Sequence, residues 1–167
     1  ATGMDALTHA VEAYVSTLAT AETDALAMSA VAAIVANLPT AYRKGKDLKA
    51  RENMAQASYD AGLAFTRSGV GYVHAISHQL GGLYHVPHGF ANAVVMPYVL
   101  DRSMPKIARR LAELARGAGV GTIASDDQTL AEQFIARIRK MNRDMGIPET
   151  IAELRREDFE TIIDRAL

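Results

Sequence analysis

Apolar residues recur at helical spacing along nearly the whole chain. Over residues 4–19 this pattern predicts an amphipathic helix, and Thr2 followed by Asp5 resembles a capping box at its start. The apolar stripe of this helix consists of Leu7, Val11, Tyr14, Val15 and Leu18. Residues 21–37 are apolar almost all round, which predicts a buried helix. Pro39 is expected to end or kink that helix, because proline lacks the backbone N–H.

The same period continues through the rest of the chain. Asp47 is placed to cap a helix that runs to about Arg67, with its inward face formed by Met54, Ala57, Ala61 and Ala64. Helical segments are then predicted over 73–82, 88–102, 104–117 and 126–145, and a last helix begins near Glu157. Pro97 is expected to kink or shorten the helix over 88–102.

The chain shows no series of strands, internal repeat or flexible linker. It has 167 residues, of which 49% are hydrophobic, so it can bury a sizeable core. We therefore expect an all-α helical bundle, with residues 1–167 forming a single domain.

Charge and cysteine content exclude several classes of function. The 18 basic and 19 acidic residues are interspersed, which argues against nucleic acid or an anionic membrane surface as a partner. The longest largely apolar run, "ALAMSAVAAIVANL", has 14 residues, whereas a spanning helix needs about 20. Without a signal-peptide pattern, a cytoplasmic protein is expected. The chain has no cysteine, so any transition metal must be held by nitrogen and oxygen ligands.

All five histidines fall in two short patches. In "GMDALTHAVEAY", Asp5 and His9 are one helical turn apart on the side nearly opposite the apolar stripe. They are therefore expected to face a polar crevice, where a carboxylate and an imidazole can hold a divalent ion. Glu12 shares this polar stripe and is a candidate outer partner of the site.

The second patch is "GVGYVHAISHQLGGLYHVPHGF". His74 and His78 lie one turn apart on a helix, and the glycine pair with Pro87 predicts a turn that brings His85 or His88 back toward it. Two of these histidines would complete a four-ligand site with the first patch, but spacing alone does not choose which two.

Simpler interpretations stay open for both patches. An aspartate and a histidine one turn apart are usually a solvated pair, and four clustered histidines can be structural. Ser77 lacks the Gly-x-Ser-x-Gly surroundings of an activated nucleophile, and the chain has no His-Glu-x-x-His helix. Tyr84 and Tyr98 are interpreted as packing residues.

Together, "GMDALTHAVEAY" and "GVGYVHAISHQLGGLYHVPHGFANAVVMP" closely resemble the two signatures of the iron-dependent (group III) alcohol dehydrogenases. The motifs stand in the same order and at a comparable separation as in that family. The helical segments between and after them resemble its C-terminal domain, so the resemblance implies that fold.

The resemblance also implies roles for individual residues. In the family, an aspartate and a histidine of the first signature and two histidines of the second hold the metal; these match Asp5, His9, His74 and His88. Fe²⁺ is implied, although Zn²⁺ or Mn²⁺ would accept the same donors. His78 matches a histidine beside nicotinamide and substrate, which implies a catalytic and cofactor-binding role in moving a proton. His85 matches a variable position, with no role beyond an outer contact.

The function implied is the metal-binding lobe of an NAD(P)-dependent alcohol dehydrogenase. In such enzymes a divalent metal polarises the oxygen of a small-molecule alcohol or aldehyde during hydride transfer. Family members have an N-terminal nucleotide-binding domain with a glycine-rich turn after a strand, and no such pattern is present here. We therefore expect a partial chain of a two-domain enzyme that is inactive alone, and family members are often dimers. A metal-dependent hydrolase and a non-catalytic helical module are the alternatives.

Overall fold

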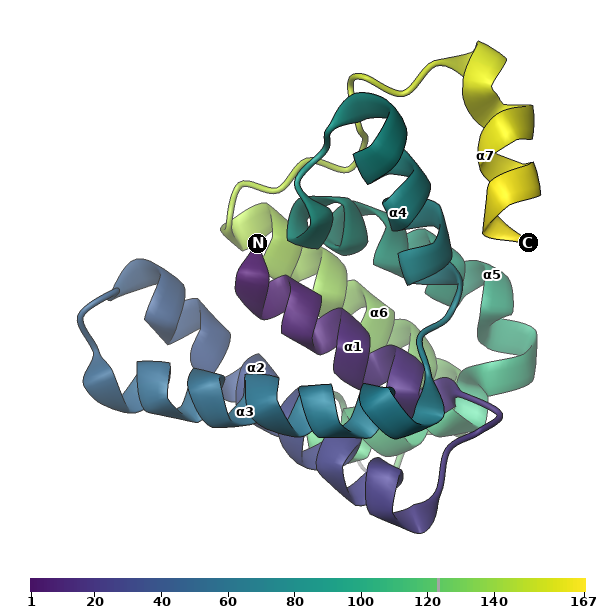
Figure 1. Ribbon diagram of the computed structural model, residues 1–167. Coiled ribbons are helices and arrows are strands. Elements are labelled where there is room, and N and C mark those ends of the chain that lie inside the picture. Colours follow the sequence, from purple (N-terminus) through teal and green to yellow (C-terminus); the bar gives the residue numbers. More distant parts are fainter. Residues whose placement is uncertain (123) are drawn as a thin grey trace.

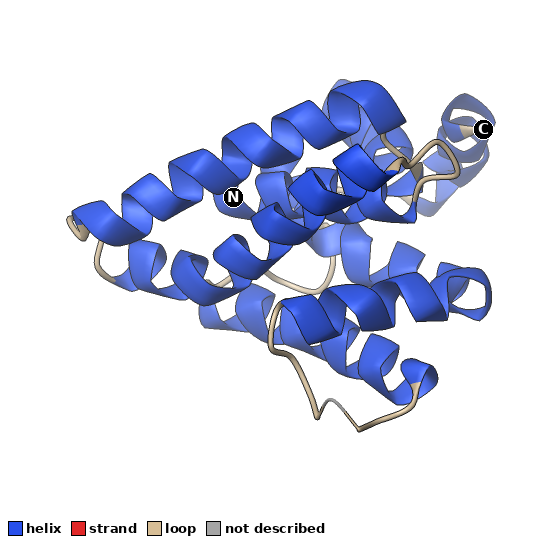
Figure 2. Cartoon of the chain, turned by 90° about the horizontal axis from the view of Figure 1, so that it is seen from below, coloured by secondary structure: helices blue, strands red, loops and turns tan. Residues whose placement is uncertain are grey.

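The computed structural model describes residues 1–122 and 124–167. Within them it is built from α-helices and one short 3-10 turn, without a strand, as Figures 1 and 2 show. The elements are α1 (Thr2–Val15), α2 (Ala21–Arg43), α3 (Leu48–Ser68), α4 (Tyr72–Tyr84), α5 (His88–Gly117), α6 (Asp127–Asp144), η1 (Arg156–Asp158) and α7 (Phe159–Ala166). The predicted all-α fold is confirmed.

The helix α1 lies in the middle of the bundle and contacts α2, α3 and α5 (Figure 1). Its Met4 and Leu7 are fully buried, as are Ile34 of α2, Leu100 of α5 and Phe134 of α6. Further contacts join α2 to α3 and α5, α5 to α6, and α4 to both α5 and α7. A helix surrounded in this way has little freedom to move, so side chains on its uncovered stripe are held in place.

Both ends of α1 differ from the prediction. The capping box is absent, because Thr2 is already helical and the first amides, those of Met4 and Asp5, donate to the Ala1 carbonyl at 3.0 Å. The helix ends at Val15, and Leu18 lies beyond it with 66% of its surface exposed.

The early end of α1 has a local cause. Ser16 adopts an extended backbone, and its hydroxyl donates to the Ser68 carbonyl at the end of α3. The hydroxyl oxygen of Ser16 also accepts a hydrogen bond from the Leu18 amide at 3.1 Å. These bonds turn the chain away from the helical path.

The prediction that Pro39 ends or kinks α2 near residue 37 is wrong about the end, since the helix continues to Arg43 with Pro39 inside it. Proline leaves the carbonyl four residues earlier without its helical donor. That carbonyl belongs to Val35, and a guanidinium nitrogen of Arg137 donates to it at 3.3 Å. A side chain from α6 thus replaces the missing bond.

The helix α2 is buried on one face and not all round; its buried residues are Thr23, Ala27, Ala30, Val31, Ile34, Val35 and Leu38. With 23 residues and a mean hydropathy of 1.5 over an 18-residue window, it is long and apolar enough to cross a membrane. The expectation that no segment reaches this length is therefore wrong, although core helices meet the same criteria.

The two helices predicted over 88–102 and 104–117 are one helix of 30 residues, with Pro97 and Pro105 inside it. At Pro97 the acceptor left free is the Ala93 carbonyl. The side-chain amide of Asn142 donates to it at 2.6 Å, so α6 again supplies the donor. The other predicted segments agree with α3, α4, α6 and α7 to within a few residues, and Asp47 caps α3 through the Ala50 amide at 3.0 Å.

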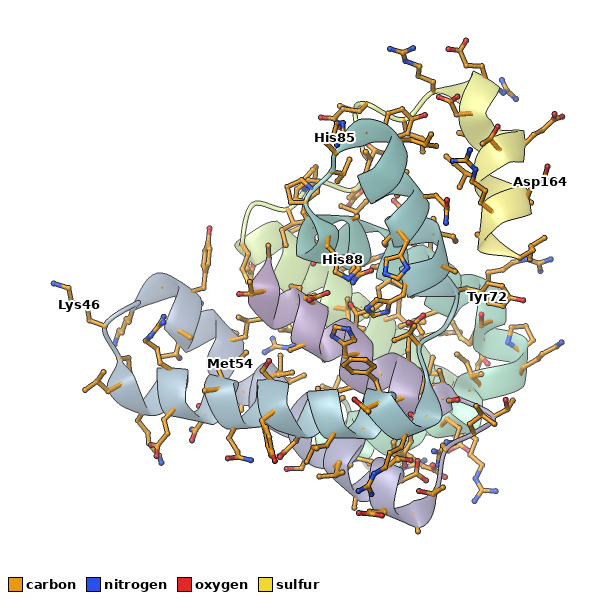
Figure 3. The ribbon with its side chains drawn as sticks, in the orientation of Figure 1. Lys46, Met54, Tyr72, His85, His88 and Asp164 are labelled. Atoms are coloured by element: carbon orange, nitrogen blue, oxygen red, sulfur yellow. The ribbon has the colours of Figure 1, made fainter. Side chains whose placement is uncertain are left out.

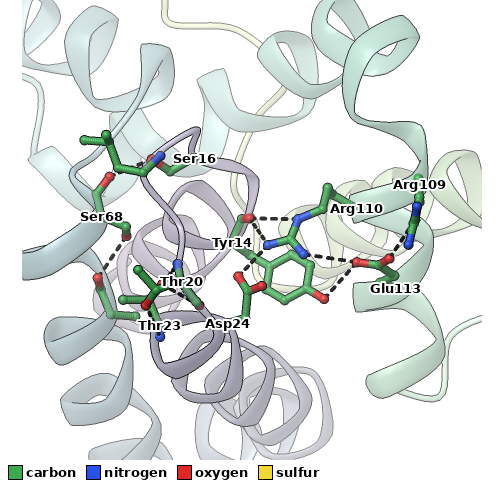
Figure 4. A network of polar contacts seen from close by, with 11 residues as sticks. Tyr14, Ser16, Thr20, Thr23, Asp24, Ser68, Arg109, Arg110 and Glu113 are labelled. Carbon is green, nitrogen blue, oxygen red and sulfur yellow. Dashed lines mark hydrogen bonds and ion pairs between the residues drawn. The ribbon is translucent and has the colours of Figure 1, made fainter.

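A polar network fixes the C-terminal end of α1 (Figure 4). The guanidinium of Arg110 on α5 donates to the Tyr14 carbonyl at 2.6 and 3.1 Å and lies 3.7 Å from the centre of the Tyr14 ring. It also pairs with Asp24 of α2 and, at 3.2 Å, with Glu113. The end of the helix that carries the first histidine patch is therefore tied to α2 and α5.

Candidate metal centre

The helix α1 presents Asp5, His9 and Glu12 along one side. Successive members are four and three residues apart, so they occupy neighbouring turns of the same face. The apolar side chains of Leu7 and Val11 point into the core instead and are fully buried. The prediction that this polar stripe faces away from the main apolar contact is borne out.

Two further helices bring the second patch to this face. His74 lies in the first turn of α4 and is 2% exposed, while His88 is the first residue of α5. Figure 3 shows His88 between α1 and α4. The start of α5 approaches α1 so closely that a Cβ on Gly89 would lie 2.9 Å from the Ala1 carbonyl oxygen. Glycine at this position allows His88 to reach Asp5.

Four side chains converge here, each offering one ligand atom: Asp5, His9, His74 and His88. These atoms lie within 4.8 Å of one another, and Nε2 of His88 is 3.4 Å from Oδ1 of Asp5. Four ligands at bonds of about 2.1 Å around a tetrahedral ion are separated by about 3.4 Å. The pair Asp5 and His88 thus has this spacing already, and no other pair of ligand atoms is more than 4.8 Å apart. Three imidazoles and one carboxylate form a donor set that suits a first-row divalent ion.

The imidazole rings pack against one another and against α3. The ring centres of His9 and His74 are 4.4 Å apart, and those of His74 and His88 are 5.2 Å apart. On its other side His9 stacks on Phe65 of α3, with 4.3 Å between the ring centres. This packing restricts how far His9 can turn from the cluster.

Asn92 is a member of the site that the sequence did not reveal. Its amide nitrogen is 2.7 Å from Oδ1 of Asp5, 3.2 Å from Nε2 of His74 and 3.1 Å from Nε2 of His88. The residue is fully buried, and its amide oxygen has no hydrogen-bond partner among the described residues. Its position one turn after His88 was the only signal available in the sequence.

Glu12 contacts the same cluster from the opposite side of His74. One of its carboxylate oxygens is 2.6 Å from Nδ1 of His74, and both groups are almost completely buried. The sequence placed Glu12 on the correct face of α1, as a candidate outer partner of the site.

The two remaining histidines differ in position. His78 is exposed, and its ring stacks on His88 with 5.2 Å between centres, so it lies beside the four-residue cluster and not within it. His85 is at the far end of α4 (Figure 3), where it adopts a left-handed conformation (φ 56°) as the C-cap of the helix. The structure therefore brings His88, and not His85, to the first patch.

Burial favours the neutral form of two imidazoles, those of His9 and His78. Burial lowers the pKa of His9, and the neighbouring His74 lowers it further. Desolvation lowers the pKa of His78 in the same direction, followed by the influence of His88. A neutral ring keeps a nitrogen lone pair free to bind a metal or to accept a proton.

A large cavity lies on another face, between α4, α5 and α7. Its volume is about 870 Å³, and side chains such as Leu80, Val94 and Ile162 make its lining largely apolar. None of the five histidines lines it. The histidine cluster and this apolar cavity are thus separate features of the molecule.

The chain is similar to known proteins over its whole length. Residues 1–167 match the model of the Fe-containing alcohol dehydrogenase family, C-terminal. The chain is 46% identical to alcohol dehydrogenase 4 of Saccharomyces cerevisiae (strain ATCC 204508 / S288c), covering 100% of this chain and 43% of the relative. It is also 46% identical to 1,3-propanediol dehydrogenase of Klebsiella pneumoniae, with 100% of this chain and 44% of the relative covered.

Two solved structures match almost the whole chain. The crystal structure of a 1,3-propanediol oxidoreductase matches with a TM-score of 0.95 and 44% identity, over 99% of this chain and 44% of that one. An alcohol dehydrogenase from Oenococcus oeni matches with a TM-score of 0.95 and 39% identity, over the same shares of the two chains. The chain therefore spans less than half the length of the proteins that it resembles.

Proposed function

Because the chain belongs to the Fe-containing alcohol dehydrogenase family, whose C-terminal part it matches over its whole length, we propose that it is the metal-binding lobe of an NAD(P)-dependent alcohol dehydrogenase. The observation that carries this proposal is the convergence of Asp5, His9, His74 and His88 from three helices onto one point. The first and last of these residues, Asp5 and His88, are 83 positions apart in the sequence, so their meeting is a property of the fold.

The four residues are the proposed metal ligands. Fe²⁺ is the ion that the family name suggests, and the same nitrogen and oxygen donors would accept Zn²⁺ or Mn²⁺. When bound, such an ion supplies a Lewis acid that polarises the oxygen of an alcohol or aldehyde. The chain itself holds the three imidazoles and the carboxylate in place. His74 and Asn92 are buried on the inner side of the site. His88 is on the more open side, where 41% of its side chain is exposed.

His78 is the proposed group for proton movement. It is exposed, it stacks on His88, and desolvation lowers its pKa. A neutral imidazole beside the ligands, on the side open to solvent, can take a proton from an alcohol and pass it outward. It would also contact the nicotinamide on that side.

The proposed substrates are small alcohols and aldehydes, and the proposed cofactor is NAD or NADP. Relatives at 46% and 43% identity are named 1,3-propanediol dehydrogenase and NAD-dependent methanol dehydrogenase. In the described residues there is no strand with a glycine-rich turn to bind a dinucleotide. We therefore assign nucleotide binding to a separate domain of the full-length enzyme, and the activity to the two domains together.

The proposal is tested with the full-length protein that carries this chain, loaded with Fe²⁺ under anaerobic conditions. Alcohol-dependent reduction of NAD or NADP is expected, and it should stop when a chelator removes the metal. His88→Ala should abolish turnover, whereas His85→Ala, a matched change outside the cluster, should leave it unchanged. Undiminished turnover by His88→Ala would contradict the proposal.

A further inference from the structure

The carboxylate of Glu12 is buried and fully engaged. It is 4% exposed, and it accepts hydrogen bonds from the amide of Gly71 at 2.8 Å and from the amide of Val73 at 2.7 Å. Nδ1 of His74 lies 2.6 Å from the same carboxylate. Burying a carboxylate is costly unless it is hydrogen-bonded, and here two backbone donors and one imidazole surround it.

Two of these bonds join the N-terminus of α4 to α1. The helix α4 has no side-chain cap of its own at its N-cap residue, Gly71. Glu12 supplies the cap from another helix, at the end of α4 where the helix dipole favours a negative charge. A Cβ on residue 71 would come within 2.9 Å of the Glu12 carboxylate, so a larger residue at this position would force the carboxylate to shift.

The third bond determines which nitrogen of His74 faces the ligand cluster. A carboxylate only accepts, so Nδ1 of His74 carries the hydrogen and Nε2 keeps its lone pair. The contact on the other side of the ring agrees with this, because the amide nitrogen of Asn92, a donor, lies 3.2 Å from Nε2. The NH₂ group of Asn92 has two hydrogens for three acceptors within 3.2 Å, so the contact with Glu12 is the one that selects the tautomer of His74.

We propose that Glu12 is a positioning residue of the metal centre: it fixes His74 in the tautomer whose Nε2 can bind the ion, and it locks α4 to the helix that carries Asp5 and His9. Metal-binding histidines commonly donate their other ring N–H to a carboxylate, which sets the tautomer and increases the basicity of the ligand atom. This inference rests on the proposed function, because it names a residue that positions a ligand of the same metal site.

The tautomer is measured first in the metal-free wild-type protein, by two-bond ¹H–¹⁵N correlation spectra of the histidine rings at mildly alkaline pH. His74→Gln identifies the His74 signals. The Nδ1–H form is expected for His74, although the Nε2–H form dominates in the side chain of free histidine. An Nε2–H signal for His74 would overturn the inference without any change at Glu12.

Metal affinity of Glu12→Gln is then compared with that of the wild type, using Co²⁺ as a probe with a visible absorption spectrum. Glutamine has nearly the same size as glutamate, but its NH₂ group would face one of the three donors that bond to the carboxylate in the wild type. Affinity should fall by about 10- to 100-fold, the range found when such outer partners are changed, and the His74 signals should shift toward the other tautomer. Glu12→Asp, which keeps the carboxylate, should recover part of the affinity.

A control variant separates this role from general stability. Glu113→Gln alters a carboxylate that bonds to Tyr14, outside the histidine cluster, and it should leave Co²⁺ affinity and spectrum unchanged. A folded Glu12→Gln protein with wild-type affinity and an unchanged His74 tautomer would overturn the role of Glu12. A wild type that binds no metal would instead count against the proposed function, because the tautomer is read independently of the metal.

Discussion

The side-chain amide of Asn142 donates a 2.6 Å hydrogen bond to the carbonyl of Ala93, the acceptor that Pro97 leaves without a helical partner. Arg137, which like Asn142 belongs to α6, donates to the carbonyl of Val35, four residues before Pro39. The helix α6 therefore holds two proline-containing helices intact. One of them, α5, carries both His88 and Asn92 at its start, so this packing also supports the candidate site.

Replacing Asn142 with alanine should destabilise the protein by about 1–3 kcal/mol, because a buried carbonyl then loses its donor. Urea unfolding followed by circular dichroism measures the change. In a Pro97→Ala background the backbone N–H of residue 97 can bond to Ala93, so the same Asn142→Ala change should cost about 1 kcal/mol less. Equal costs in the two backgrounds would show that the Asn142 bond does not compensate for the proline.

Stability should fall at high pH through Tyr14. Burial raises the pKa of this phenol to about 12, with help from its hydrogen bond to Glu113. The folded pKa is above the value of about 10 in the unfolded chain, so the contribution is complete below pH 10 and is lost as pH rises from 10 to 12. One pKa unit corresponds to about 1.4 kcal/mol, so the full loss is on the order of 3 kcal/mol.

The free energies of unfolding of the wild type and Tyr14→Phe, measured at a series of pH values, check this prediction. Phenylalanine lacks the titrating group, and the variant should lose less stability between pH 10 and 12. The same loss in both proteins would assign the pH dependence to other groups.

Much of the fold could be predicted because the relevant signals are local. The helical period located the helical segments, although it divided α5 into two, and Asp47 identified the start of α3. The expectations that Pro39 ends α2 and that Pro97 shortens its helix failed for one physical reason: the missing backbone donor is replaced by a side chain from α6, about 100 residues away for Pro39 and about 45 for Pro97. Such compensation depends on tertiary contacts that no local pattern contains.

The candidate site divides in the same way. Helical spacing placed Asp5, His9 and Glu12 on one face of α1, since that depends on a single helix. Spacing left the choice between His85 and His88 open, because it depends on the turn between α4 and α5; the motif resemblance favoured His88, which the structure places in the cluster. The role of Asn92 beneath the cluster requires three helices in their packed positions, and the sequence did not predict it.

His85 should be replaceable without harm to the candidate site. It is exposed and left-handed, a conformation that costs most residues about 1–2 kcal/mol and glycine much less. The greater freedom of glycine in the unfolded chain offsets part of this gain. The unfolding free energy of His85→Gly, from urea titration, should be unchanged or higher by up to about 1 kcal/mol, with wild-type metal content. Loss of metal in this variant would place His85 within the site after all.

His78 should separate catalysis from metal binding. It lies beside the cluster and stacks on His88 without being one of the four converging residues. His78→Gln in the full-length enzyme should keep the metal and lower kcat by about 10²- to 10⁴-fold, the range for loss of a general acid–base group. Metal content by elemental mass spectrometry and initial rates of NAD reduction give the two readings. Unchanged kcat would remove His78 from the mechanism.

The central claim is that two distant motifs build one metal site, and metal content tests it most directly. Tag-free protein is purified anaerobically and analysed by elemental mass spectrometry beside His88→Ala and the control His85→Ala. The account predicts bound divalent metal, close to one ion per chain, in the wild type and the control, and loss of that metal in His88→Ala. Equal metal in all three proteins, or none in the wild type after reconstitution with Fe²⁺, would contradict it.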